Sequence, residues 1–135
     1  MKPFLVWLAF AVAILGGVSV GSHLYLSESQ HRILIGVDAS FPMRDVWDKV
    51  PGVIKTIEGG RYSVYSLITD KGLVHGWSTK PRLSAFSPYG PRNINKILSE
   101  NSYRQIDEAS ERYLITNANE NDITDLNGWE LIRLQ

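Results

Sequence analysis

An apolar run that ends in two oxygen-bearing side chains is the part of this sequence best suited to chemistry. Residues 33–37 carry no charge, and Asp38 and Ser40 follow at once. A short continuous apolar run predicts a strand that is buried on both faces. In an open α/β sheet, ligands bind beyond the carboxyl ends of the strands. We therefore expect Asp38 and Ser40 to lie at a binding edge of the sheet.

The same two side chains also fit a purely structural role. Their oxygens can cap the backbone N–H groups of the turn that enters the next helix. Apolar residues recur at three- and four-residue steps over residues 45–57, which predicts that helix. Pro51 lies inside the pattern and should kink or split it.

The remaining pattern predicts the elements of one α/β domain. Alternation over residues 61–70 and an apolar stretch at 73–77 predict a hairpin. A proline- and serine-rich loop, two short helical segments and two further strands follow, at residues 78–92, 93–98, 106–109, 111–118 and 129–134. This order favours a small, mainly parallel sheet with flanking helices and one antiparallel hairpin.

The first part of the chain predicts a membrane helix. Residues 3–22 carry no charge and are long enough to cross a bilayer. We expect a transmembrane signal anchor at residues 1–23, a stalk at 24–32 and the α/β domain at 33–135. A cleaved secretory signal, with small residues at 19–21 as the cleavage site, is the other interpretation. Lys2 favours a cytoplasmic N-terminus, which in a bacterium puts an inner-membrane protein's domain in the periplasm.

Two glycines in this helix form a small-xxx-small pattern. Gly17 and Gly21 lie one helical turn apart and are candidates for packing against another membrane helix. Ordinary glycine usage near a helix end explains the same pattern equally well.

Composition narrows the function classes. The chain has 14 basic and 14 acidic residues, so a general attraction for nucleic acid is not expected. It has no cysteine, which excludes thiol chemistry. Its histidines, His23, His31 and His75, follow no zinc-ligand spacing, and no nucleophile motif occurs. We therefore expect a protein that is not an enzyme.

The order of elements, with Asp38-Ala39-Ser40 after the first strand, resembles the von Willebrand factor A (vWA) domain, a Rossmann-like fold. That family's first strand ends in Asp-x-Ser-x-Ser, and its metal site adds a threonine and an aspartate from later loops. Asp38 and Ser40 match the family pattern, but Pro42 replaces the second serine and Asn117 replaces the aspartate. The resemblance implies a reduced vWA-like domain whose Mg²⁺ site, at Asp38, Ser40 and Asn117, is degenerate.

These observations favour a membrane-anchored protein–protein interaction module. It would be an accessory, assembly or scaffolding subunit of a larger membrane complex, with no cofactor. Candidate contact residues are Phe86, Tyr89 and Trp77, which lie in or near loops. Packing within the domain is the alternative for all three, and it applies most to Trp77. Two alternatives remain: a metal-dependent adhesion or chaperone-type vWA domain that binds a partner's acidic residue, and an exported small-ligand-binding domain.

Overall fold

The computed structural model describes residues 2–135, which form two compact units divided between Gln30 and His31. The first unit is helix α1 (Lys2–Glu28), whose 27 residues rise about 40 Å. Its apolar side chains are exposed along its length. By length and composition the helix could cross a membrane, as could the helix of a signal sequence. Met1, the first residue of the expected anchor, lies outside the described residues.

Helix α1 is longer than the sequence pattern indicated. It continues to Glu28, and the first strand already begins at His31. Of the nine residues expected to form a stalk, 24–32, only Ser29 and Gln30 therefore lie outside a helix or strand. A Cβ built on Gly17 or Gly21 meets no atom within 4 Å, so both glycines lie on open helix surface.

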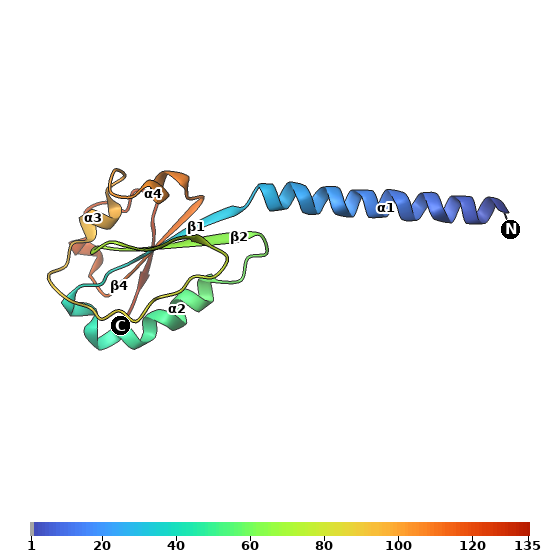
Figure 1. The fold of residues 1–135 in the computed structure, drawn as a ribbon. Coiled ribbons are helices and arrows are strands. Elements are labelled where there is room, and N and C mark those ends of the chain that lie inside the picture. Colours follow the sequence, from blue (N-terminus) through green and yellow to red (C-terminus); the bar gives the residue numbers. More distant parts are fainter. Residues whose placement is uncertain (1) are drawn as a thin grey trace. The chain divides into compact units, whose positions relative to one another are not determined.

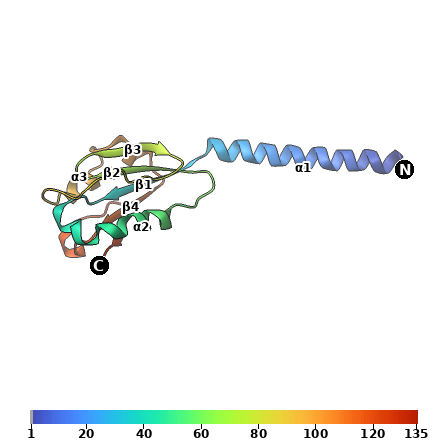
Figure 2. The same cartoon turned by 60° about the horizontal axis from the view of Figure 1, so that its bottom comes forward.

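The second unit is built on a five-stranded mixed sheet with the strand order β3-β2-β1-β4-β5. Figure 1 shows the fold, and Figure 2 shows β3, β2, β1 and β4 side by side in that order. Strand β1 (His31–Val37) lies at the centre, between β2 (Ser63–Thr69) and β4 (Glu111–Thr116), which both run parallel to it. Strand β5 (Glu130–Arg133) adds a parallel edge, and β3 (Leu73–Ser78) adds an antiparallel one. The predicted α/β class and mainly parallel sheet are confirmed.

The helical segment after β1 covers one face of the sheet and is split as the sequence predicted. A 3₁₀ helix, η1 (Phe41–Lys49), leads directly into α2 (Val50–Ile57). Pro51 lies in the first turn of α2, where its missing N–H needs no partner within the helix. The proline thus marks the junction between the two segments and does not interrupt α2.

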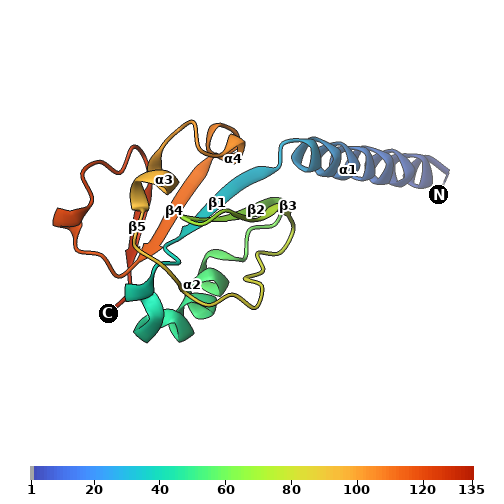
Figure 3. The same ribbon diagram turned by 60° about the vertical axis from the view of Figure 1, so that its left-hand side comes forward.

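Two short helices cover the opposite face (Figures 1 and 3). They are α3 (Ile94–Leu98) and α4 (Arg104–Glu108), and each is one to two turns long. A third short segment, η2 (Glu120–Asp122), lies in the polar connection between β4 and β5. The sequence pattern located α3 and α4 to within a few residues, whereas η2 was not predicted.

The sheet separates two apolar clusters, one beneath each helical layer. Side chains of β1 alternate between the clusters, with Ile35 on the α2 face and Leu34 on the α3 face. Every residue of β2 is buried. The alternation of apolar and polar residues in β2 therefore does not separate a buried face from an exposed one, because helices or loops cover both sides of the strand.

Gly36 allows one layer to approach the sheet closely. A Cβ at this position would lie 2.7 Å from Ile97 Cγ2 and 2.9 Å from a ring carbon of Trp129. Both neighbours are buried and have little room to move. We expect Gly36→Ala to lower the free energy of unfolding by about 1–3 kcal/mol through overpacking. Urea unfolding followed by tryptophan fluorescence measures this loss, and Gly76→Ala, where a Cβ meets nothing within 4 Å, is the control.

A small polar cluster joins the amino ends of β1 and β4. Glu111 accepts hydrogen bonds from Tyr113 Oη, at 2.9 Å, and pairs with His31 Nε2, also at 2.9 Å. The hydrogen bond to Glu111 is the main reason that the pKa of Tyr113 is raised to about 12, and partial burial adds to it. Hydrogen bonds from His31 and Tyr113 hold the pKa of Glu111 below its usual value.

This cluster predicts an alkaline titration. Because the folded-state pKa of Tyr113 is raised, its contribution to stability is complete below the unfolded value of 10.0 and is lost as the pH rises toward about 12. We expect Glu111→Gln to lower the pKa of Tyr113 toward 10.0. Phenolate absorbance, compared between the parent and a Tyr113→Phe variant, isolates this tyrosine. An unchanged titration in Glu111→Gln would contradict the assignment.

Candidate functional site

Polar side chains follow the carboxyl ends of the three central strands. Asp38 comes after β1, Asp70 after β2, and Asn117 after β4. Val37 is in register with Thr69 on one side and with Ile115 on the other, so the three strands end at the same edge. The expectation that Asp38 and Ser40 lie at the carboxyl edge of a central strand is confirmed.

The Asp38 carboxylate is the centre of this edge. It is fully buried, and its Oδ1 accepts a hydrogen bond from the Ser40 backbone N–H at 3.0 Å. Its Oδ2 accepts from Arg92 Nε at 2.8 Å and from Thr116 Oγ1 at 2.7 Å. Asp38 therefore caps its own turn, as the structural interpretation predicted, and it also joins that turn to β4 and to the distant Arg92. The same prediction is wrong for Ser40, whose side chain forms no cap hydrogen bond.

Arg92 connects Asp38 to Asn117. Its Nη2 donates to Asn117 Oδ1, while its Nε holds Asp38. The Asn117 amide in turn donates to the Pro42 carbonyl at 2.7 Å. The planar guanidinium is suited to bridging two oxygen acceptors at once. The three candidate metal residues are thus brought to one place, where Arg92 holds two of them.

The donor set does not fit a divalent cation while Arg92 holds this position. The guanidinium already supplies a positive charge next to Asp38 Oδ2 and Asn117 Oδ1, so a cation between the same oxygens would be repelled. The Ser40 hydroxyl is buried and has no hydrogen-bond partner among residues 2–135, but one hydroxyl does not complete a shell. Within that same range, no group of three or more His, Cys, Asp or Glu side chains is placed to hold a metal.

Asp70 is a second buried carboxylate that the sequence patterns did not single out. Its Oδ1 accepts from the Ala39 backbone N–H at 3.0 Å, and its Oδ2 pairs with Lys71 Nζ at 2.8 Å. Lys71 also donates to the Pro91 carbonyl at 2.7 Å. An available signal was the position of Asp70 at the end of the alternating segment 61–70.

The pKa of Tyr103 is sensitive to the charge of Asp70 at this edge. Its hydroxyl donates to the Thr69 carbonyl at 2.8 Å, one residue before Asp70. Burial raises the pKa of Tyr103, and the negative charge of Asp70 raises it further. The two buried carboxylates, with Arg92 and Lys71 beside them, thus form a closed and charge-balanced network.

The loop over residues 79–92 is held against the same edge. Tyr89 N donates to the Ala39 carbonyl and Phe41 N donates to the Gly90 carbonyl, both at 2.9 Å. The Phe86 ring lies 6.1 Å from the Trp47 ring and 5.8 Å from the Tyr89 ring. Tyr89 nevertheless remains 53% exposed. Two of the three predicted contact residues, Phe86 and Tyr89, therefore lie together beside the carboxyl edge.

Trp77, the third predicted contact residue, lies elsewhere. It packs against the apolar cluster on the α3–α4 face, and its Nε1 donates to Glu108 Oε2 at 2.6 Å. That hydrogen bond is the main reason that the pKa of Glu108 lies below its usual value. The Arg32 guanidinium lies 5.6 Å from the centre of the Trp77 ring. The side chain is thus already engaged by its own domain.

Comparison of the chain with family models, with curated proteins and with solved structures finds no match. The geometry of the carboxyl edge and of the adjoining loop is therefore the basis for the functional interpretation.

Proposed function

We propose that this chain is a membrane-anchored protein–protein interaction module, and specifically an accessory, assembly or scaffolding subunit of a larger membrane complex. One observation carries the proposal: Arg92 closes the edge at which an α/β sheet normally receives a ligand, by binding Asp38 and Asn117. The polar residues of this edge hold loops in place. The adjoining loop presents Tyr89 on the surface.

The hydrogen bonds of His75, the one histidine in the β2–β3 hairpin, support a role without catalysis. Both ring nitrogens of His75 are bound by backbone groups, Nε2 by Arg82 N at 3.1 Å and Nδ1 by the Gly76 carbonyl at 2.7 Å. An imidazole held in this way has no nitrogen left to accept a substrate proton. We accordingly propose that the protein is not an enzyme and uses no cofactor.

The proposal includes a fold relationship. We propose that the second unit is a reduced vWA-like, Rossmann-related domain with a degenerate metal motif. Support comes from the antiparallel strand pair β2–β3 after the first helical segment, and from the position of Asp38 and Ser40 at the end of β1. Arg92 then provides the positive charge at the place where the resemblance implies a metal.

The proposal also includes a location. We propose that α1 is retained in a cell inner membrane, with a cytoplasmic N-terminus and the second unit in the periplasm. Residues 3–27 contain no charged side chain, while Lys2 precedes them. N-terminal sequencing of the protein from carbonate-washed membranes tests this. A chain that begins after residue 21, or that is released by the carbonate wash, would overturn it.

A copurification experiment tests the interaction role. The full chain, extracted in mild detergent after crosslinking, is expected to run as a defined complex with other membrane subunits. A Phe86→Ala/Tyr89→Ala variant is expected to lose that complex, while Thr124→Ala, an exposed position in the β4–β5 connection, is expected to keep it. A parent chain that runs alone as a monomer would overturn the proposal.

Calorimetric titration separates this role from the metal-dependent alternative. We expect the parent chain to show no binding of Mg²⁺ or Mn²⁺, because Arg92 neutralises Asp38. Binding in the millimolar range or tighter, lost in Asp38→Ala, would favour a metal-dependent adhesion domain.

A further inference from the structure

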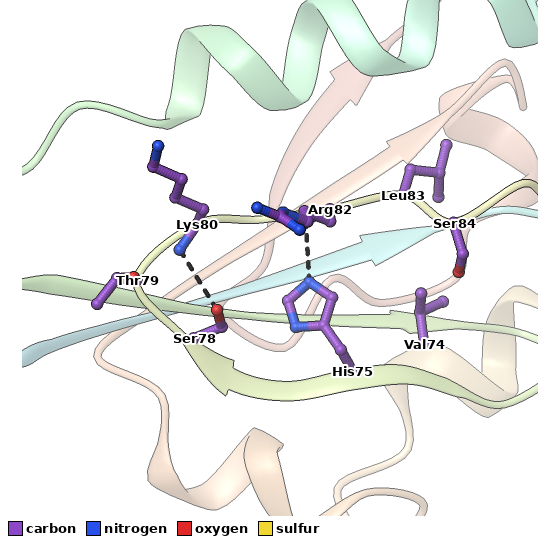
Figure 4. A pocket seen from close by; sticks show the side chains of 8 residues that line it. All are labelled: Val74, His75, Ser78, Thr79, Lys80, Arg82, Leu83 and Ser84. Carbon is purple, nitrogen blue, oxygen red and sulfur yellow. Dashed lines mark hydrogen bonds between the residues drawn. The ribbon is translucent and has the colours of Figure 1, made fainter.

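Two adjoining hollows form a groove between edge strand β3 and the loop that follows it. Their volumes are about 470 and 270 Å³, and they share Val74 and Ser84. Figure 4 shows the residues that line the first of them. The groove runs from Lys80 at one end to Tyr89 at the other. Both hollows are open to solvent and neither is an enclosed pocket, so the shape favours an extended segment over a small molecule.

The groove combines apolar and cationic side chains. Leu73 and Tyr89 line it and are 49% and 53% exposed, so apolar surface is available to a partner. The charged residues that line the two hollows are all basic: Lys71, Lys80 and Arg82. This bias contrasts with the whole chain, in which basic and acidic residues are equal in number.

Two of these cations are available for binding. Lys71 is already neutralised by Asp70. The side chains of Lys80 and Arg82 form no ion pair or hydrogen bond within residues 2–135, and both residues are exposed. Exposed cations without a partner, beside an apolar surface, are complementary to an acidic segment that carries apolar residues.

The groove is preformed, because side chains of β3 hold its outer wall. Figure 4 shows His75 accepting the Arg82 N–H at Nε2, at 3.1 Å. His75 Nδ1 lies 2.7 Å from the Gly76 carbonyl, so the two contacts together place the ring proton on Nδ1. The Ser78 hydroxyl accepts from Lys80 N at 3.5 Å. A fixed wall reduces the conformational entropy that the groove itself would lose on binding a partner.

We propose that this groove binds an extended acidic segment of a partner protein. Carboxylates of the segment pair with Lys80 and Arg82, and an apolar residue packs on Leu73 and Tyr89. The inference rests on the proposed function and names the chemistry of its partner. It also gives a role to β3, which is an edge strand and leaves one side open to an added chain.

Fluorescence anisotropy of the full chain in detergent micelles tests this proposal. The probe is a labelled peptide of alternating Glu and Leu, compared with the same peptide carrying Gln for Glu. We expect the acidic peptide alone to bind, with an affinity that falls as salt is added. Lys80→Glu/Arg82→Glu is expected to weaken binding more than about tenfold.

Lys96→Glu/Arg133→Glu is the matched control, since it makes the same change in net charge at exposed positions on α3 and β5. It is expected to bind within about twofold of the parent. Equal binding of the Gln peptide, or equal loss in both double variants, would overturn the proposal. So would stronger binding of an oligonucleotide or of anionic vesicles with the same dependence on Lys80 and Arg82.

The peptide and copurification experiments can fail separately. One outcome is that the Lys80→Glu/Arg82→Glu variant keeps the complex of the parent chain and that the parent chain does not bind the acidic peptide. The groove proposal is then wrong, and the interaction role stands. If the peptide binds at Lys80 and Arg82 but the chain always runs as a monomer, the role as a subunit is wrong. Unchanged thermal midpoints in both double variants establish that each remains folded.

Discussion

Arg92→Ala is expected to lower the free energy of unfolding by about 2–3 kcal/mol. The substitution leaves the fully buried Asp38 carboxylate without its charged partner. Removing one member of a buried pair typically costs more than this, but the Arg92 side chain is 25% exposed, so solvent reduces the loss. Urea unfolding of the full chain in detergent, followed by tryptophan fluorescence, measures the change.

Two further variants separate the charge of Arg92 from its geometry. Arg92→Lys keeps the charge, but an ammonium cannot hold Asp38 and Asn117 with the fixed fork of a guanidinium. We therefore expect an intermediate loss. Arg104→Ala, whose side chain is 85% exposed, removes a surface pair and is expected to change stability by less than about 1 kcal/mol. A loss in Arg92→Ala no larger than that in Arg104→Ala would contradict the bridging role.

The elements of this fold could be predicted because their signals are local. The uncharged run at residues 33–37 marks the central strand, and Pro51 marks the junction between η1 and α2. The position of Asp38 at the sheet edge follows from the end of that run. Periodicity did not show that both faces of β2 are covered, because alternation of apolar and polar residues does not specify what packs on either face.

The partners at the edge could not be predicted, because they depend on the path of a long loop. Arg92 lies 54 positions from Asp38 in the sequence, and nothing in the residues between them specifies that the two meet. The Asp70–Ala39 hydrogen bond spans 31 positions. Trp77 is a candidate contact residue because it is apolar and lies near a loop, but the same features are compatible with packing inside the domain. Its packing against the α4 face follows from the hairpin register, which the sequence does not show.

The turn after β1, at residues 38–40, is held by Arg92 and also by Asp70, which follows β2. Its carboxylate is the hydrogen-bond acceptor for the Ala39 N–H, and both residues are buried. Asp70→Ala leaves that N–H without a partner and leaves Lys71, with 14% of its side chain exposed, without its counter-ion. We expect the free energy of unfolding to fall by about 2–4 kcal/mol, most of it from the orphaned N–H.

Asp70→Asn distinguishes the acceptor from the charge at this position. The amide keeps an oxygen for the Ala39 N–H and nearly the same volume, so we expect a smaller loss in urea unfolding than in Asp70→Ala. Because the charge of Asp70 contributes to the raised pKa of Tyr103, both variants are expected to lower that pKa, as read from phenolate absorbance. Equal loss of stability in the two variants would show that Asp70 acts through its pairing with Lys71, and the Ala39 contact would then contribute little.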